Sequence, residues 1–298
     1  MPTRMERLMV LLCSLLFCPS QNLPVKLPQS LDEKDDIVMQ FVIDPDKPEN
    51  DSATGQNDLG KEKMYPVDLI LKINSQFEEN VSEDVSIIFG DIAVYNRLGN
   101  ADQCASNKCH WRKSKDGNVY IPYQLSPLFR SDDRDIILGA MKAIEKATCI
   151  RYRRQSRQKY YLSIKPLDGC WSYVGRQHKE QELSLGTGCV YHGIVQHELL
   201  HALGFHHEQS RSDRDSYVNI YFENIKEDKK NNFKKVETNN LGTDYDYGSI
   251  MHYGKDAFSK NGKPTILPKP NPNTAIGQRL DLSDTDIKKI ITLYECCK

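Results

Sequence analysis

The sequence predicts an α+β protein. Three observations carry this prediction in a chain of 298 residues. A helical pattern and several short strands follow one another from Cys104 onward. A second helix then precedes a long polar stretch that is rich in turns. Helices and strands that do not alternate regularly favour α+β architecture over a doubly wound parallel sheet.

The first elements of the globular part are a strand and a helix. Residues 119–123, VYIPY, have the β-branched and aromatic composition of a strand. Residues 132–148 have apolar side chains at helical spacing, so they predict a helix. Ser131 or Asp132 is the expected N-cap, because a side-chain oxygen there accepts from the first free backbone N–H groups.

Further strands and two more helices follow. Residues 149–152 and 160–164 read as strands, and residues 182–185 read as a strand at the edge of the sheet. Residues 190–203 predict the second helix. The last helix is expected from residue 283 to Leu293, where isoleucines recur at helical spacing.

The N-terminus resembles a secretory signal peptide. Arg4 and Arg7 precede an apolar run over residues 8–17, and the small residue Ser20 follows. The run is about half of the ~20 residues that a membrane span needs. We therefore expect residues 1–20 to be a signal peptide, and the protein to be secreted without a membrane anchor.

An acidic leader is expected between the signal peptide and the globular part. Residues 21–97 hold 16 acidic and 7 basic residues, whereas residues 98–298 hold 24 acidic and 31 basic residues. The contrast fits an acidic segment docked on a basic domain, or two solvated surfaces with unrelated charge. The basic residues are scattered without a groove of interleaved aromatics, so no nucleic acid partner is expected.

The leader has its own landmarks. Its first 40 residues are poor in apolar side chains and are expected to be loosely ordered, whereas residues 81–95 are apolar and extended. Asn50 and Asn80 stand in N-glycosylation sequons. Cleavage after Arg97 and cleavage before Asn100 both fit, so the expected division is a propeptide over 21–99, with its boundary between 97 and 99, and a catalytic domain over 100–298.

The segment HELLHALGFHH at residues 197–207 predicts a catalytic metal site. His197 and His201 are four residues apart, so they lie on one face of a helix. Gly204 can end that helix and bring His207 toward the same point. Three imidazoles leave the fourth position of a zinc ion to water, which is typical of a catalytic site.

Glu198 follows the first of these histidines. It lies ~100° around the helix from His197, so it stands beside the metal rather than on it. A carboxylate there can take a proton from zinc-bound water and pass it to a leaving amine. The pattern therefore predicts hydrolysis of peptide bonds. His206 points elsewhere and is expected at the surface or behind the ligands.

The extended motif resembles the metzincin signature, and Ser249-Ile250-Met251-His252-Tyr253 resembles its Met-turn. Glu208 and the SIMHY form of the turn narrow the resemblance to the astacin family of secreted zinc endopeptidases. It covers residues 104–296 and the leader. The resemblance implies an upper lobe with a twisted mixed sheet and two long helices, an active-site cleft, and a largely irregular lower lobe with a C-terminal helix.

The resemblance also implies roles for single residues. His197, His201 and His207 would bind one zinc ion per chain, with Glu198 as general base. Met251 would form an apolar floor, and Tyr253 a fifth, switchable ligand that stabilises the oxyanion. Glu208 would receive the new N-terminal ammonium after the leader is removed.

The leader carries Ile88-Phe89-Gly90-Asp91, which is similar to the astacin prosegment motif although many members have Phe at the first position. Asp91 would take the open zinc position in the precursor, so that the propeptide inhibits its own enzyme.

Nine cysteines are present, of which Cys13 and Cys18 leave with the signal peptide. In an exported protein the other seven are expected to form cross-links, with one thiol left over. The family resemblance implies Cys170–Cys189 and Cys149–Cys296, with Cys297 as the alternative partner of Cys149. A further Cys104–Cys109 bridge would place the chain in the six-cysteine subgroup that includes hatching enzymes.

The sequence thus predicts a secreted, zymogen-activated zinc endopeptidase of hatching-enzyme type. Its expected partners are extracellular glycoproteins such as those of an egg envelope, and secretory granules could store the precursor. Two alternatives stay open: a six-cysteine peptidase of another tissue, such as kidney or blood-forming tissue, and a secreted binding protein without activity.

Overall fold

The computed structural model describes residues 66–77, 80–82, 84–95 and 109–296. The predicted signal peptide, the Asn50 sequon, the processing region, Cys104 and Cys297 lie outside these ranges. Among the described residues, no helix has the length and apolar character needed to cross a bilayer.

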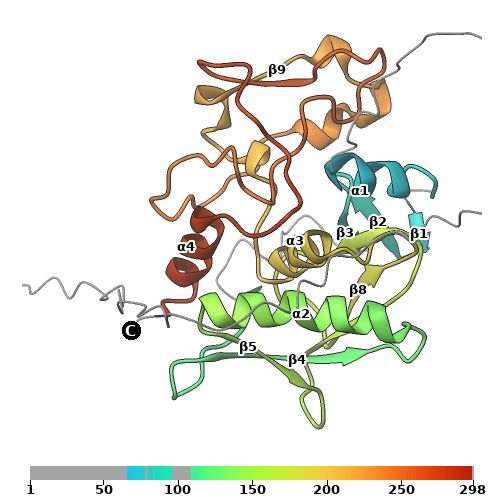
Figure 1. The fold of residues 1–298 in the computed structure, drawn as a ribbon, viewed down its shortest axis with the longest axis vertical. Helices are drawn as coiled ribbons and strands as arrows, with labels where there is room; N and C mark the ends of the chain where they lie inside the picture. Colours follow the sequence, from blue (N-terminus) through green and yellow to red (C-terminus); the bar gives the residue numbers. More distant parts are fainter. Residues whose placement is uncertain (1–65, 78–79, 83, 96–108, 297–298) are drawn as a thin grey trace, which may run out of the picture. The chain divides into compact units, whose positions relative to one another are not determined.

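The centre of the fold is a mixed sheet of eight strands, which run in the order β1-β2-β3-β7-β8-β6-β4-β5 (Figure 1). Four neighbouring strands, β5, β4, β6 and β8, pair in parallel, and β7 then pairs antiparallel with β8. The bounds of these five strands are Val119–Leu125 (β4), Ile150–Arg154 (β5), Tyr161–Lys165 (β6), Cys170–Ser172 (β7) and Glu180–Leu185 (β8).

The four strands expected from the sequence are all present, but one has a different place. Residues 182–185 belong to β8, which lies between β6 and β7 and not at an edge. The short strand β7 follows a turn at Gly169, which has a φ of +80°, and no apolar run marks it in the sequence. The edge prediction for residues 182–185 is therefore wrong, because β7 covers that side of β8.

Two helices pack together over the sheet (Figure 1). α2 spans Ser131–Ala147 and buries Ile137, Ala140, Met141 and Ile144 in the main apolar core. α3 spans His192–Ala202 and has ten buried residues out of eleven. The N-cap of α2 is Arg130, so the prediction of Ser131 or Asp132 is wrong. Ser131 already has helical geometry, and its hydroxyl donates to Asp132 at 3.1 Å.

The chain after α3 is mostly irregular. It contains four short 3₁₀ turns, Glu208–Ser210, Arg214–Ser216, Phe222–Asn224 and Glu227–Phe233, and two paired strands, β9 (Val218–Ile220) and β10 (Ile266–Pro268). A second apolar cluster around Phe233 and Tyr253 supports this region. α4, Asp284–Leu293, begins with a capping box between Ser283 and Asp286, as the start predicted at residue 283 requires. The α+β prediction is confirmed.

The leader adds one helix and three strands to the fold. The segment expected to be extended forms β1 (Asn80–Ser82), β2 (Val85–Ile88) and β3 (Ile92–Tyr95), and β3 pairs in parallel with β7. The helix α1, Pro66–Asn74, was not predicted, because nine residues give a weak periodic pattern. Ile70 and Ile73 of α1 are buried in the main core.

Two disulfides are formed by described residues. Cys149 bonds to Cys296, and Cys170 bonds to Cys189. Of the two partners considered for Cys149, the structure contains Cys296. Cys109 is also disulfide-bonded, and its expected partner Cys104 lies outside the described residues. The first bridge fastens the end of the chain to the junction of α2 and β5, and the second fastens β7 to the loop before α3.

Candidate metal centre and active site

The helix α3 holds two of the predicted ligands side by side. His197 and His201 are completely buried, and their Nε2 atoms are 3.1 Å apart. The Nδ1 atom of His197 lies 2.9 Å from the Ile250 carbonyl, and that of His201 lies 2.8 Å from the Phe205 carbonyl. A carbonyl oxygen only accepts, so each ring donates from Nδ1 and keeps the lone pair of Nε2 for a ligand.

The end of α3 brings in the third ligand. Gly204 has a φ of +107°, and its N–H donates to the His201 carbonyl while Phe205 N–H donates to the Leu200 carbonyl. This is the Schellman arrangement that closes a helix at a left-handed residue. The chain then turns so that His207 lies 5.3 Å from the His197 ring and 4.8 Å from the His201 ring, centroid to centroid. The predicted turn at Gly204 is confirmed.

Asp91 of the leader lies among the three imidazoles. Its carboxylate oxygens are 3.0 Å from Nε2 of His197, 3.0 Å from Nε2 of His207 and 3.4 Å from Nε2 of His201. Burial alone would raise the pKa of Asp91, but the close approach of the three imidazoles holds it well below its ordinary value. The carboxylate therefore stays ionised.

The four residues fit one zinc ion. Their ligand atoms, three imidazole nitrogens and one carboxylate oxygen, all lie within 4.8 Å of one another. Burial lowers the pKa of His197 well below its ordinary value and that of His207 to about 4, so both rings are neutral at neutral pH. Neutral imidazoles and a carboxylate are ligands that zinc prefers, and two of the rings are oriented from behind by carbonyls.

Glu198 is held without a partner next to the ligands. Both of its carboxylate oxygens are buried and make no hydrogen bond within the protein. Burial, followed by the charge of Asp91, raises the pKa of Glu198 well above its ordinary value. A buried carboxyl group without a partner is costly, so its position favours exchange of a proton with a bound water or substrate.

Tyr253 faces the same centre from the irregular region. It is fully buried, its ring centroid is 4.6 Å from that of His207, and its hydroxyl donates to the Phe89 carbonyl of the leader. Gly90 follows with a φ of +83°, and a Cβ atom there would approach Leu71 to 2.8 Å and the Tyr253 hydroxyl to 3.3 Å. Glycine at position 90 therefore allows the leader to pass close to the metal centre.

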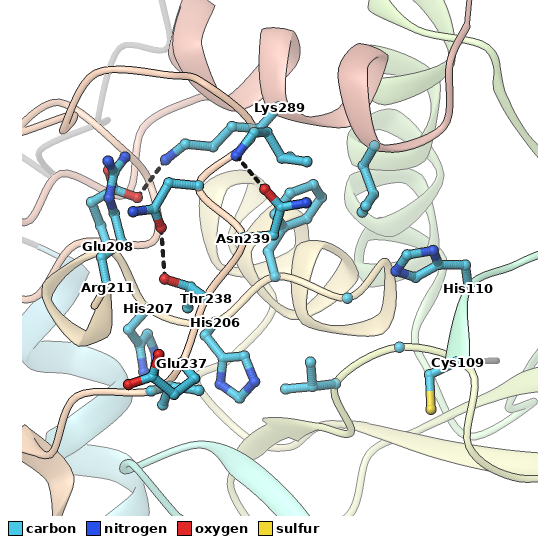
Figure 2. Close-up of a pocket in the computed structure, with 18 residues that line it drawn as sticks. Cys109, His110, His206, His207, Glu208, Arg211, Glu237, Thr238, Asn239 and Lys289 are labelled. Carbon is cyan, nitrogen blue, oxygen red and sulfur yellow. Dashed lines mark hydrogen bonds and ion pairs between the residues drawn. The ribbon is translucent and has the colours of Figure 1, made fainter. Parts of the chain in front are cut away.

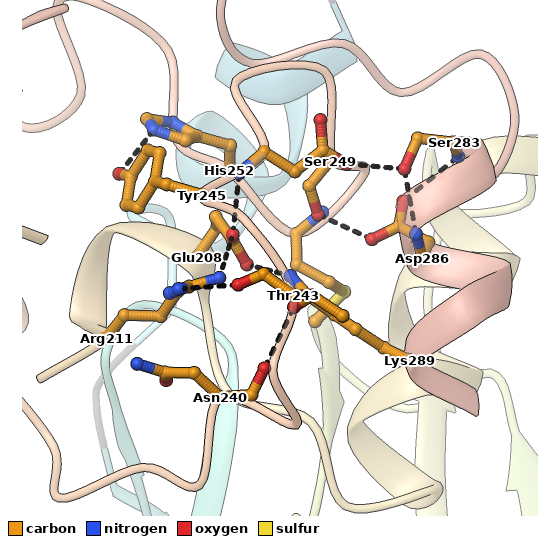
Figure 3. Close-up of polar contacts among 12 residues, drawn as sticks. Glu208, Arg211, Asn240, Thr243, Tyr245, Ser249, His252, Ser283, Asp286 and Lys289 are labelled. Carbon is orange, nitrogen blue, oxygen red and sulfur yellow. Dashed lines mark hydrogen bonds and ion pairs between the residues drawn. The ribbon is translucent and has the colours of Figure 1, made fainter. Parts of the chain in front are cut away.

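The turn that contains Met251 is fastened by a residue that the sequence did not single out. Asp286 at the start of α4 accepts hydrogen bonds from the Ser249 hydroxyl at 2.6 Å and from the Ile250 N–H at 2.9 Å (Figure 3). Met251 is buried in the main apolar core. Because Ile250 also orients His197, Asp286 connects α4 to the metal centre through this turn.

Glu208 has two cationic partners in the structure. Its carboxylate pairs with Nζ of Lys289 and lies 3.1 Å from Nη1 of Arg211 (Figures 2 and 3). It also accepts from the N–H of Asp246 at 2.9 Å. Burial raises the pKa of Glu208, which Lys289 opposes. The family resemblance implies a new N-terminus as the partner of Glu208, and the sequence gives no sign of Lys289.

A cavity of about 530 Å³ lies beside this ion pair. Figure 2 shows Glu208, Arg211 and Lys289 on one side of it and Cys109 and His110 on the other. His206 also lines the cavity. The cavity thus extends from Cys109 and His110, which are the first residues described after the leader, to Glu208.

Arg279 is a second buried charge that the sequence did not reveal. Its guanidinium donates to the His252 carbonyl at 2.9 Å, and its backbone lies against Gly193, where a Cβ atom would come 1.9 Å from the Arg279 carbonyl oxygen. Burial lowers the pKa of Arg279 to about 10. It remains a cation, and its charge lowers the pKa of the neighbouring His197.

Comparisons with known proteins agree with this geometry. The family model that describes the astacin family of peptidases matches residues 105–295. High choriolytic enzyme 1 of Oryzias latipes is 49% identical over 220 residues, which are 73% of this chain and 81% of that protein. Low choriolytic enzyme of the same fish is 42% identical over 252 residues, which are 83% and 90% of the two chains.

A solved structure shares the fold. High choriolytic enzyme 1, a hatching enzyme zinc-protease from the medaka fish, aligns with a TM-score of 0.63 and 51% identity, over 66% of this chain and 100% of that chain. The family match covers more than half of the chain and includes the histidine centre, Glu208 and the Met251 turn. The chain therefore belongs to the astacin family, and it is a zinc metalloendopeptidase of hatching-enzyme type.

Proposed function

We propose that this protein is secreted as a latent precursor, that removal of residues 21–99 activates it, and that it then cleaves glycoproteins of an egg envelope. The observation that supports latency is the position of Asp91 against all three histidines. A carboxylate there takes the place that the attacking water needs. The leader is thus its own enzyme's inhibitor.

His197, His201 and His207 would hold the zinc, which supplies Lewis acidity and makes a water more acidic. Glu198 takes the proton of the attacking water at its carboxylate and later delivers it to the leaving amine nitrogen. Its partnerless, buried carboxylate supports this role. The Tyr253 hydroxyl, now used by the Phe89 carbonyl, would donate to the oxygen of the substrate carbonyl as negative charge develops there.

The leader also occupies a strand edge that a substrate could use. The N–H of Ser172 in β7 donates to the Asp91 carbonyl at 3.0 Å. Removal of β3 would free this edge for the extended backbone of a protein substrate. In this proposal the carboxylate at the metal blocks the reaction itself, and the covered edge keeps out the extended backbone of protein substrates.

Glu208 is proposed to bind the new N-terminal ammonium after processing. The cavity of about 530 Å³ reaches from Cys109 to Glu208, which supports entry of the new terminus from that side. Lys289 already neutralises part of the Glu208 charge. The ammonium would then bind next to the existing ion pair of Glu208 and Lys289, and it would not be the first cation to pair with the Glu208 carboxylate.

The names of the relatives support the substrate class. Two of them are choriolytic enzymes of a fish, and the aligned solved structure is described as a hatching enzyme. We extend this to the present chain as cleavage of egg-envelope glycoproteins. Isolated egg envelopes incubated with the processed enzyme should release soluble fragments.

Glu198→Gln tests the catalytic assignment. The variant should bind zinc like the wild type but lose activity on casein by about 10²–10⁴-fold, because the amide cannot accept the proton. Glu223→Gln, at an exposed position, is the matched control and should remain active. Elemental analysis measures whether the variant keeps its zinc, and the rate of casein cleavage measures whether it loses its activity. Normal activity of Glu198→Gln would refute the assigned base.

Asp91→Ala tests the latency assignment. The unprocessed variant should cleave a small fluorogenic peptide, whereas the wild-type precursor should not, because the carboxylate no longer blocks the metal. Mass spectrometry must show that the leader is intact during the assay. A variant precursor that stays as silent as the wild type would contradict the role of Asp91.

A further inference from the structure

Three aromatic rings meet where the leader leaves the sheet. Tyr95, at the end of β3, stacks on Tyr173 with 5.4 Å between ring centroids and 17° between planes. His178 meets Tyr95 edge-on at 4.2 Å and Tyr173 edge-on at 5.0 Å. Tyr95 belongs to the leader, whereas Tyr173 and His178 belong to the catalytic part. One ring of the three would therefore leave on activation.

The two remaining rings are held by contacts within the catalytic part. Tyr173 is 1% exposed and packs edge-on against Trp171, whose indole N–H donates to the Asp168 carbonyl at 2.9 Å. The Gln181 side chain is fully buried and accepts from the backbone N–H of His178 at 3.4 Å. None of these contacts needs the leader.

Gln181 fixes the whole loop that carries His178. Its Oε1 also accepts from the N–H of Gln177 at 2.8 Å, and its Nε2 donates to the Gly175 carbonyl at 2.8 Å. The loop is thus fastened at both ends from inside the protein. The surface that Tyr173 and His178 offer to Tyr95 should keep its form after Tyr95 has gone.

Tyr95 lies against this surface as a substrate side chain could. It lies four residues along the chain from Asp91, and an extended chain rises ~3.3 Å per residue, so its distance from the metal centre is about 13 Å. The Nε2 atom of His178 is buried without a hydrogen-bond partner, so the ring contributes its face and edge to the contact. Stacked and edge-on contacts are the two arrangements that aromatic pairs prefer.

We propose that Tyr173 and His178 form an aromatic subsite of the processed enzyme, and that it takes a Tyr, Phe or Trp side chain of the substrate about four residues from the bond that is cut. Tyr95 is the internal occupant of this subsite in the precursor. The inference rests on the proposed removal of the leader. It adds a preference for an aromatic residue at a fixed distance from the cleavage point.

Peptide cleavage tests this preference. We would take a fluorogenic peptide that the processed enzyme cuts at one bond and place Tyr, Phe or Ala at the fourth residue on either side in turn. At one of the two positions, Tyr and Phe should raise kcat/KM by about fivefold to tenfold over Ala. His178→Ala should remove this preference, so that the variant cuts the Tyr, Phe and Ala peptides with similar kcat/KM. Lys179→Ala, next in the loop and exposed, should keep it.

A binding measurement separates this inference from the proposed function. The zinc-loaded, processed Glu198→Gln variant is titrated with the Tyr peptide and the Ala peptide, and the ring resonances of His178 are followed by NMR. Only the Tyr peptide should shift them. Equal shifts with both peptides, or an aromatic preference that survives His178→Ala, would overturn the subsite. Failure of the wild type to cut any peptide would refute the proposed function and leave the NMR outcome to decide on the subsite.

Discussion

The region before Gly204 and the region after it are stabilised in different ways. Residues 109–203 place their backbone in strands and two helices, and most of their buried residues are apolar. Residues 205–283 have only two short strands, and many of their buried residues are polar or charged: His207, Glu208, Gln209, Arg211, Arg214, Asn232, His252 and Arg279. Regular backbone pairing holds the first region, whereas side chains bonded to main-chain groups hold the second.

The metal centre lies where the two regions meet. His197 and His201 come from the helix, and His207 and Tyr253 come from the irregular chain. The comparison shows that an irregular segment, like a helix, can hold a metal-ligand side chain in position. The irregular segment needs buried hydrogen bonds to do so. It also predicts that loss of a side chain that holds the second region by hydrogen bonds destabilises the protein more than loss of an exposed side chain.

The largest effect is expected from Asp286→Ala. Asp286 accepts from the Ser249 hydroxyl and from the N–H groups of Ile250 and Ser283, and the substitution leaves these buried donors without an acceptor. We expect a loss of about 2–4 kcal/mol in the free energy of unfolding, together with weaker zinc binding. Asp284→Ala, at an exposed position of the same helix, should cost less than about 1 kcal/mol.

Urea unfolding of the zinc-loaded proteins gives both values. If the two aspartate variants lose the same stability, side-chain hydrogen bonds do not hold the irregular region as described.

Smaller effects of opposite sign are expected at two glycines, of which Gly204 lies at the boundary of the two regions and Gly139 lies within the first. Gly204→Ala forces alanine into a left-handed conformation at the end of α3, so it should destabilise by about 1–2 kcal/mol. Gly139→Ala lies within α2, where a Cβ atom meets nothing within 4 Å, and it should stabilise by about 0.5–1 kcal/mol. Thermal unfolding of both variants checks the signs. Stabilisation by Gly204→Ala would contradict the role of this glycine.

The effect that is smallest at neutral pH, where it vanishes, concerns acid stability through His252. Burial lowers the pKa of His252 to about 3, and the ring bonds to the Tyr253 carbonyl and to the Tyr245 hydroxyl. The unfolded chain binds a proton at this residue below its ordinary pKa of 6.5, and the folded chain does not. Its contribution to folding is therefore present above pH 6.5 and falls as the pH drops toward 3, by up to about 1.4 kcal/mol per pH unit.

His252→Gln removes this titration. The difference in unfolding free energy between the wild type and the variant should therefore change with pH below 6.5 and stay constant above it. Urea titrations at a series of pH values measure this difference. A difference that is independent of pH would show that His252 does not titrate on unfolding.

The same comparison explains what the sequence could predict. Periodic patterns located α2, α3, α4 and four of the strands, and the HELLHALGFHH spacing predicted three histidines that the structure brings together with Asp91. Asp286, Lys289 and Arg279 were not found, because each is a single charged residue in a polar stretch with no periodicity. Their partners lie between 27 and 81 residues away, which only the fold reveals. α1 was too short to give a signal.

One consequence follows from the pairing of β3 with β7. An exposed edge strand can pair with any extended polypeptide, including a second copy of the same protein. The processed enzyme should therefore lose activity during storage by association between molecules, and the loss should be faster at higher protein concentration. The precursor should retain its capacity to be activated. The same backbone amide groups of β7 would therefore determine both the storage stability of the protein and its ability to bind a substrate.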